Sequence, residues 1–282
     1  MSSDATLWVL PARPRRKLDK YVAIAALSFR QRLDDRAVLV GRVMFYAIIL
    51  AIYSRLWQEV LGASGASLLG DRALGHSAAS YVWYLAVTEW IMLAQPSVYL
   101  EIEADVRNGD VAYQLSRPLS YVGAKLSAAL GELALRWLVL GASGLMLGRL
   151  FSGEWPNPEG LVGALLVGAL AGLVMLLAYV AIGLSAFWLH DVTPIFLIWQ
   201  KLSFVLGGLM LPIGIYPDWL RVIAEHTPFA ALLYGPGQLV VQGGADNVLR
   251  LAVTLAAWGA LFLMVVVLLE RRARRNVCLH GG

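Results

Sequence analysis

Residues 160–187 read GLVGALLVGALAGLVMLLAYVAIGLSAF and contain no charged side chain. The hydrocarbon core of a bilayer is about 30 Å thick, and roughly 20 residues of α-helix cross it. The run is therefore long enough to span a membrane. We expect a helix, because each backbone N–H and C=O group inside a bilayer needs a partner within its own segment.

Five more apolar stretches of similar length, with few charges each, lie on either side of this run. They are residues 38–58, 80–100, 125–149, 192–212 and 248–269. The whole chain is 59% hydrophobic and 15% charged, against roughly 45–50% and 25% in soluble domains. The sequence predicts an all-α integral membrane protein with six transmembrane helices. We expect one domain over residues 1–282, in which 38–269 hold the spans and 1–37 and 270–282 are basic cytoplasmic ends.

The distribution of lysine and arginine predicts the orientation. Cytoplasmic loops of membrane proteins carry an excess of these residues. If the N-terminus is cytoplasmic, the inner segments hold fifteen of them and the outer segments hold five. Both termini are therefore expected in the cytoplasm. The cations lie beside the spans, so the net charge of +4 indicates contact with the lipid bilayer and no nucleic-acid partner.

The segment before the first span has the pattern of an amphipathic helix. Its apolar residues fall on one helical face, whereas most charged residues lie elsewhere. The apolar positions are Leu18, Tyr21, Val22, Ala25, Phe29 and Leu33. Such a helix suits the cytoplasmic membrane surface, with its cations near anionic lipid headgroups. A soluble surface helix is the alternative.

Motifs for catalysis are absent from the sequence. It contains no G-x-x-x-x-G-K-[ST] phosphate-binding loop, no H-E-x-x-H and no G-x-S-x-G. The four histidines lie far apart, and no Cys/His cluster occurs. We therefore expect no catalytic residue, no metal site and no cofactor in this chain, which would not be an enzyme.

The most informative polar segment is EIEADVRNGDVAYQLSRPLS at residues 101–120, between the second and third spans. Asn108, Gly109 and Asp110 indicate a turn after a short helix, and Pro118 would end a second short helix. Charges together with apolar residues on a cytoplasmic helix suit docking to another protein. An ordinary solvated loop explains the composition equally well.

Residues 213–247 are too long for a turn and rich in proline and glycine. Their apolar pieces, 219–224 and 229–234, are too short to cross a bilayer. Irregular backbone at membrane depth is tolerated only where protein or a cavity covers it. We interpret the region as short re-entrant helices that form an outer gate, with a folded outer loop as the alternative.

Charged residues within the spans are costly when they face lipid. Glu132 and Arg136 lie four residues apart on one helix face and are expected to pair. Glu89 has no such partner in its own helix and is a candidate for the translocation path, as is Lys201. Arg42 and Lys201 also fit side chains that extend to the inner interface.

The order and spacing of two segments resemble the six-span type-2 ABC transporter permeases. The first match consists of Arg107, Gly109, Asp110, Leu115, Arg117 and Pro118. The second consists of GGLMLP at residues 207–212, then Tyr216-Pro217, then residues 227–229. Each motif alone is loose, but the resemblance extends from the amphipathic N-terminal segment to the basic tail.

The resemblance implies a permease subunit of an ATP-driven exporter in a bacterial cytoplasmic (inner) membrane. It would pair with a second permease subunit, as a homodimer or heterodimer, and receive a separate ABC ATPase that carries ATP and magnesium. The coupling helix would include Glu101, Glu103, Asp105, Arg107, Asp110, Arg117 and Pro118. The outer gate would include Pro212, Tyr216, Pro217, Pro228 and Phe229.

The apolar and aromatic character of the spans indicates an amphiphilic or lipophilic substrate. A second class of function fits the same spans. In an ion-coupled secondary transporter, Glu89 or Lys201 would be the proton or ion site.

Overall fold

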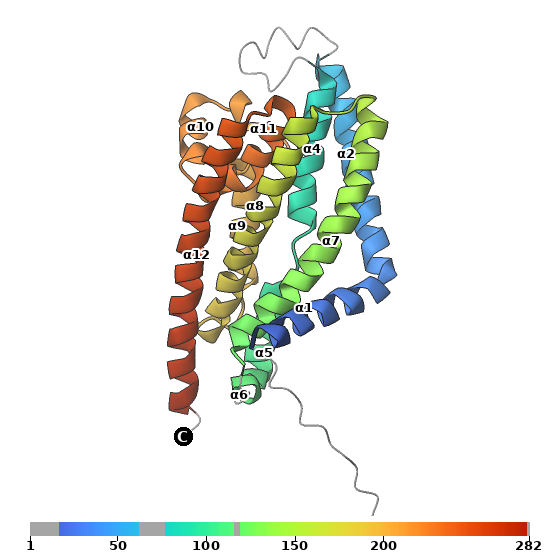
Figure 1. Cartoon of the computed structure of the whole chain (residues 1–282). Helices are drawn as coiled ribbons and strands as arrows, with labels where there is room; N and C mark the ends of the chain where they lie inside the picture. Colours follow the sequence, from blue (N-terminus) through green and yellow to red (C-terminus); the bar gives the residue numbers. More distant parts are fainter. Residues whose placement is uncertain (1–16, 62–76, 116–118, 281–282) are drawn as a thin grey trace, which may run out of the picture.

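The computed structural model describes residues 17–61, 77–115 and 119–280, and the regular elements among them are all helices (Figure 1). In chain order they are α1 (Lys17–Asp34), α2 (Arg36–Val60), α4 (Ala78–Leu93), α5 (Val98–Asn108), α6 (Asp110–Leu115), α7 (Tyr121–Ser152), α8 (Pro158–Leu184), the 3-10 helix η3 (Ser185–Phe187), α9 (Thr193–Leu206), the 3-10 helix η4 (Ile213–Ile215), α10 (Asp218–Glu225), the π-helix η5 (Ala230–Tyr234), α11 (Gly235–Gln242) and α12 (Ala245–His280). This part of the chain confirms the all-helical prediction.

Four helices of the described residues are long and apolar enough to cross a membrane. They are Arg36–Val60, Tyr121–Ser152, Pro158–Phe187 and Ala245–Arg274. Each contains one of the expected spans. The other two expected spans, 80–100 and 192–212, coincide in part with shorter helices, which are α4 and the apolar helix α9.

The expected span at 80–100 is broken into two helices. α4 ends at Leu93, and α5 begins at Val98. Pro96 lies in the gap; proline has no backbone N–H and disfavours helical backbone in the residue before it. The sequence-based expectation of one continuous helix was therefore wrong at this point.

Two arginines from other helices bind the carbonyl groups that this break leaves free. Arg42 of α2 donates from Nη1 to the Leu93 carbonyl at 2.7 Å, and Arg136 of α7 donates from Nη1 to the Gln95 carbonyl at 2.5 Å. Unpaired carbonyl groups at a helix end need such partners when they are buried. The expectation that Arg42 extends to the membrane interface is replaced by this cap on α4.

The helix in the expected span at 192–212 also ends before the span does. α9 ends at Leu206, and Gly208 follows with φ of +65°, a left-handed conformation that glycine adopts without strain. Tyr84 of α4 donates its hydroxyl proton to the Gly208 carbonyl. Thr88, one turn further along α4, donates to the Leu209 carbonyl at 3.1 Å.

The core of the molecule lies along α4, α7 and α8. α8 packs against α5, α11 and α12, whereas α7 packs against α1, α2 and α4. Close approach of α4 to α7 depends on glycine: a Cβ atom on Gly148 would lie 2.7 Å from the ring of Trp83. α2 and α12 bury little of their apolar surface within the chain, which leaves that surface for lipid or another subunit.

The two ends of the bundle differ. α1 lies across one end, beside α5 and α6, and α12 ends there too (Figure 1); we call this the α5 end. α10 and α11 lie at the opposite end, which we call the α10 end. α1 packs against α7 through Tyr21 and Ala25, while Leu18 and Val22 are exposed. The apolar face of α1 is therefore shared between α7 and the surroundings.

Candidate functional site

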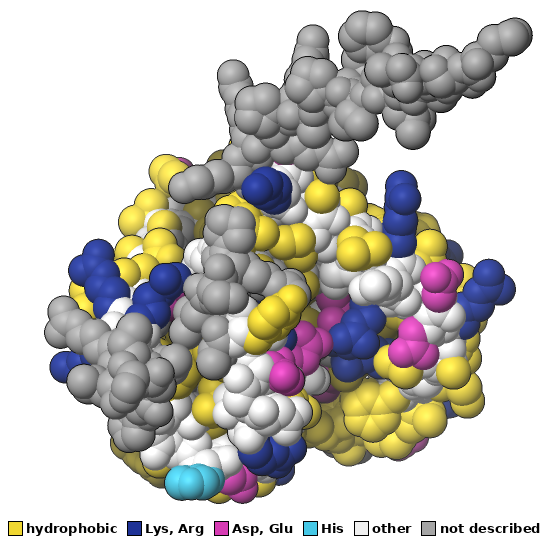
Figure 2. Space-filling model, turned by 90° about the horizontal axis from the view of Figure 1, so that it is seen from below, with side chains coloured by type: hydrophobic (Ala, Val, Ile, Leu, Met, Phe, Trp, Pro, Cys, Tyr) yellow, Lys and Arg dark blue, Asp and Glu magenta, His cyan; other side chains and the backbone are white. Residues whose placement is uncertain are grey.

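A network of charged side chains joins three helices at the α5 end. Its members, here called the charge network, are Arg32, Glu101, Asp105, Lys125, Glu132 and Arg136. Figure 2, which views this end, shows acidic and basic side chains lying next to one another on the surface. The network is built from residues on α1, α5 and α7, which are far apart in the sequence.

Arg32 is the link between the three helices. From α1, its Nη2 donates to Glu101 Oε1 on α5 at 3.0 Å, and its Nε donates to Glu132 Oε2 on α7 at 2.9 Å. Glu132 also pairs with Arg136 on the next turn of α7. The pair of Glu132 and Arg136 predicted from their spacing is thereby confirmed, and Arg32 extends it to α1.

Lys125 and Asp105 form the second half of the network. Lys125 Nζ lies 2.7 Å from Asp105 Oδ2 and 4.0 Å from Glu101 Oε2. The same Asp105 oxygen accepts hydrogen bonds from the Tyr121 hydroxyl at 2.9 Å and from Gln114 Nε2 of α6 at 3.1 Å. Asp105 therefore holds α5, α6 and the start of α7 in fixed positions relative to one another.

Local sequence explains how α5 presents these carboxylates. Glu101 and Asp105 lie four residues apart, so both project from one face of the helix. Val98 and Ile102 are buried on the side that packs against α8. Gly109 ends the helix with φ of +78° and lets α6 begin at once.

Glu103 lies apart from the charge network. It is buried beside a cavity of about 350 Å³ whose wall includes Arg107, Trp188 and His190. Arg107 Nη1 is 3.9 Å from Glu103 Oε1. Hydrogen bonds from the side chain and backbone of Thr193 lower the pKa of the nearby Asp191, and the positive charge of Arg107 acts in the same direction.

The remaining residues expected in the coupling helix are at the surface or outside the described part. Arg107 and Asp110 are exposed at the end of α5 and the start of α6. Arg117 and Pro118 lie outside the described residues. Sequence reasoning missed Arg32, Lys125 and Gln114, because nothing in the spacing of residues on three separate helices indicates that they meet.

The two residues expected in the translocation path have different surroundings. Glu89 is 3% exposed within the core of α4, and its Oε1 has no hydrogen-bond partner among the described residues. Lys201 is exposed on α9, with Nζ 5.5 Å from the centre of the Phe204 ring.

The residues expected in the outer gate surround the end of α9. Tyr216 is buried and donates its hydroxyl proton to the Val205 carbonyl at 2.7 Å. The Phe229 ring lies 4.8 Å from that of Trp199 on α9. Three prolines mark the turns of this region: Pro212 precedes η4, Pro217 precedes α10, and Pro228 precedes η5.

Comparison with known proteins identifies a family. A family model described as ABC-2 family transporter protein matches residues 74–276, which is more than half of the chain. The matched region begins before α4 and includes α5, α7, α8, α9 and most of α12. No curated protein matches the chain.

Proposed function

This chain belongs to the ABC-2 transporter family, and we propose that it is the membrane-spanning permease subunit of an ATP-driven exporter. A separate ATPase subunit, which binds ATP and magnesium, would supply the energy. A second permease subunit, identical or homologous, would complete the translocation path. We place the assembly in a bacterial cytoplasmic (inner) membrane.

Six crossings are proposed for the single permease domain over residues 1–282. The four long helices provide four of them. The fifth crossing would consist of α4 and the break before α5, where Arg42 and Arg136 bind the free carbonyl groups. The sixth crossing would consist of α9 and residues 207–212. The α5 end would then be cytoplasmic, with both termini, and the α10 end would face outward.

The charge network is the observation that carries the proposal. It joins the exposed α5–α6 pair to α1 and α7 through ion pairs of 2.7–3.0 Å. A force applied to α5 and α6 by an ATPase would therefore reach both helices directly. In this assignment Arg107 and Asp110 contact the ATPase, with Arg117 and Pro118 following them, and Glu101 and Asp105 transmit the movement.

Glu103 has a further place in this proposal. Its carboxylate lies under the surface that Arg107 presents, beside the cavity lined by Trp188 and His190. A change in the position of α5 would alter this cavity and the turn after α8 together. Glu103 would thus extend the coupling from α5 to α8 and α9.

The path itself is proposed from burial and position. Glu89 is a buried carboxyl group in the middle of α4, and Lys201 is a cation on the exposed side of α9. Tyr216 and Phe229 contact α9. The segment that contains them and the three prolines would form the outer gate. The largely apolar surfaces suit an amphiphilic or lipophilic substrate.

The decisive experiment tests association with the partner ABC ATPase, which we would seek first among the adjacent reading frames. The chain and that ATPase would be co-expressed and purified together in detergent. Arg107→Glu reverses the charge of an exposed side chain, and we expect association to weaken about tenfold or more. The matched control is Arg149→Glu, which lies near the end of α7 that is far from α5, at the α10 end, and is expected to leave association unchanged.

Unchanged association of Arg107→Glu would remove the assignment of α5 and α6 as the docking element. A transport assay separates the exporter from an ion-coupled secondary transporter. In proteoliposomes we expect transport to require ATP and an ATPase with an intact phosphate-binding loop. Transport that proceeds without the ATPase and follows a proton gradient would favour the ion-coupled mechanism, with Glu89 or Lys201 as its site.

A further inference from the structure

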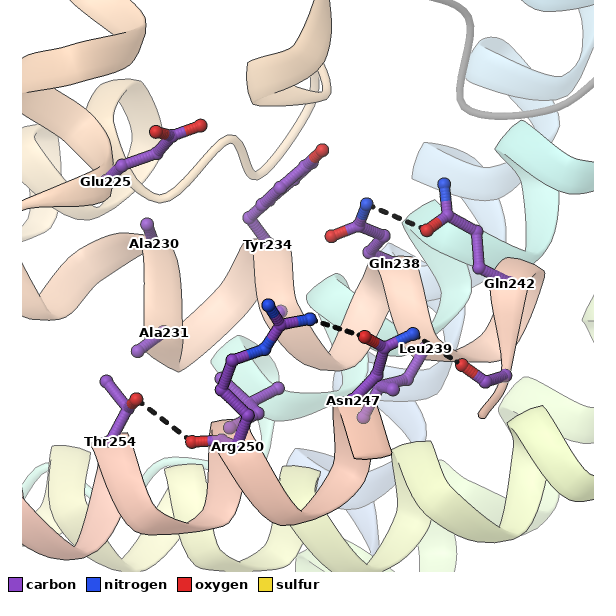
Figure 3. A pocket seen from close by; sticks show the side chains of 13 residues that line it. Glu225, Ala230, Ala231, Tyr234, Gln238, Leu239, Gln242, Asn247, Arg250 and Thr254 are labelled. Atoms are coloured by element: carbon purple, nitrogen blue, oxygen red, sulfur yellow. Dashed lines mark hydrogen bonds between the residues drawn. The ribbon is translucent and has the colours of Figure 1, made fainter. Parts of the chain in front are cut away.

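A cavity of about 480 Å³ opens at the α10 end, between η5, α11 and the start of α12 (Figure 3). It is far from the charge network, which occupies the other end of the bundle (Figure 1). Its wall combines apolar side chains with amides, one guanidinium and one carboxylate. Ligand pockets commonly have this mixture, and volumes of roughly 300–1,000 Å³.

Close packing of α11 on α12 bounds the cavity. A Cβ atom on Gly235 would lie 2.6 Å from Leu251 Cδ2, so α11 and α12 are in close contact at that point. The preceding turn is the π-helix η5, and Ala230 and Ala231 present small side chains to the cavity. A π-helix places its residues on a wider turn and often occurs at functional sites.

Arg250 is held in position at the wall formed by α12. Its Nη2 donates to Asn247 Oδ1 at 2.5 Å, and Asn247 Nδ2 donates to the Gly243 carbonyl at 3.0 Å. Figure 3 shows the guanidinium between α12 and the helix that carries Tyr234 and Gln238. Asn247 is neutral, so this contact does not neutralise the exposed guanidinium, which has five N–H donors in all.

The other polar groups of the wall fit an anion beside Arg250. Gln238 Nε2 donates to Gln242 Oε1 at 2.9 Å, which leaves amide N–H groups of both residues for a ligand. The carboxylate on the wall, Glu225, is paired with Arg221 at 3.1 Å on α10. That ion pair reduces its repulsion of an anion in the cavity.

The helices that line the cavity also carry exposed apolar side chains. Leu249 and Val253, on one face of α12, are 67% and 61% exposed. On α10, Trp219 and Val222 are also exposed at this end of the molecule. Exposed aromatic and aliphatic residues on helices that also carry polar groups are typical of the boundary between lipid tails and water.

We propose that this cavity binds the headgroup of a phospholipid, with the phosphate on Arg250 and the acyl chains along Leu249 and Val253. Arginine suits phosphate because its planar N–H groups form paired, charge-assisted hydrogen bonds. Gln238 and Gln242 add neutral donors. The site adjoins the proposed outer gate and is far from the charge network, and lipid binding there requires no ATPase.

Photolabelling of the full chain in lipid nanodiscs tests the site. The probe is phosphatidylglycerol with a photoactivatable diazirine in its acyl chain. We expect labelling within residues 245–260, and Arg250→Gln should lower that labelling about tenfold. Arg149→Gln, an exposed arginine at the same end on α7, is the control and should leave labelling unchanged.

Competition identifies the chemistry of the ligand. Unlabelled phosphatidylglycerol should displace the probe, whereas diacylglycerol with the same acyl chains and inorganic phosphate should not. Equal displacement by diacylglycerol would exclude headgroup recognition, and equal displacement by inorganic phosphate would exclude an amphiphile site. Labelling of Arg250→Gln at the level of the unmodified chain would also overturn the proposal.

Two further variants keep the test decisive if Arg250→Gln does not fold. Arg250→Lys retains the charge but loses the paired hydrogen bonds, and should lower labelling by a smaller factor. Gln238→Leu removes an amide donor from the opposite wall and should also lower it. Full labelling in both variants would contradict the site. Because the assay contains no ATPase, its result is independent of whether the chain is an exporter.

Discussion

Arg32 is a single side chain on which the positions of three helices depend. It bonds Glu101 on α5 and the buried Glu132 on α7. If alanine replaces Arg32, Glu132 keeps one ion-pair partner among the described residues, which is Arg136. A hydrogen-bonded charge that loses a partner destabilises a protein by about 1–3 kcal/mol.

We therefore expect Arg32→Ala to lower the free energy of unfolding by about 1–3 kcal/mol and to reduce ATP-driven transport. Thermal unfolding in detergent and transport in proteoliposomes measure the two effects. The control is Arg30→Ala, an exposed arginine on the same helix. If both variants behave alike, Arg32 does not have the linking role assigned to it.

Gly131 is a point of close approach between α1 and α7. A Cβ atom there would overlap the Ala25 carbonyl oxygen. Gly131→Ala should therefore push α1 away from α7 and lower the free energy of unfolding by about 1–3 kcal/mol, as overpacking does. Protease sensitivity of α1, measured with thermal unfolding, would report the displacement.

A matched glycine lies in the same chain. A Cβ atom on Gly41 of α2 would meet no atom within 4 Å, so Gly41→Ala should stabilise that helix by about 0.5–1 kcal/mol. No destabilisation by Gly131→Ala would show that the contact of α1 with α7 is not as described. Destabilisation by Gly41→Ala would show instead that the surroundings of Gly41 on α2 are not open.

Buried charged side chains stabilise the break between α4 and α5. Arg136 binds the Gln95 carbonyl and pairs with Glu132. Arg136→Met removes one of the two ion-pair partners of the buried Glu132, the other being Arg32, and should cost about 1–3 kcal/mol. When Glu132→Gln is already present, the same change should cost less, because no buried charge loses its partner.

A double-mutant cycle measures this coupling through the unfolding of both single variants and the double variant. We expect a coupling energy of about 1–3 kcal/mol. Additive effects would mean that Arg136 acts mainly through the Gln95 carbonyl. In that case the charge of Glu132 would be balanced by Arg32 from α1.

For the whole molecule, six crossings predict the side on which each turn lies. After Cys278→Ser, single cysteines at Asp110, Asn157, Asp191 and His226 would be tested with a membrane-impermeant thiol reagent. We expect Asn157 and His226 to be labelled from outside intact cells, and Asp110 and Asp191 only after permeabilisation. Labelling of Asp110 and His226 from the same side would contradict an odd number of crossings between them.

Much of the architecture was predictable because it is a local property of the sequence. A run such as residues 160–187 is longer and less charged than a soluble core requires, and it becomes α8 and η3. The turn at residues 108–110 followed from one glycine, which has a positive φ in the structure. The spacing of Glu132 and Arg136 likewise predicted their contact, since residues four apart share a helix face.

The candidate site was only partly predictable. Glu101 and Asp105 were identified from their segment, and both belong to the charge network. Their partners Arg32 and Lys125 come from other helices, so no spacing along the chain links them. Glu103, identified from the same segment, faces a different cavity, because consecutive helical residues point in different directions.

The amino-acid sequence by itself determined that this chain is an all-helical membrane protein, since hydrophobic length and charge placement are sufficient for that conclusion. The tertiary structure decided where the helices break and which charges meet. Arg42, expected to extend to the inner interface, and Arg136, expected to pair with Glu132, both bind carbonyl groups freed beside Pro96. The physical reason is that a buried polar group must be paired, and its partner can come from any helix that packs nearby.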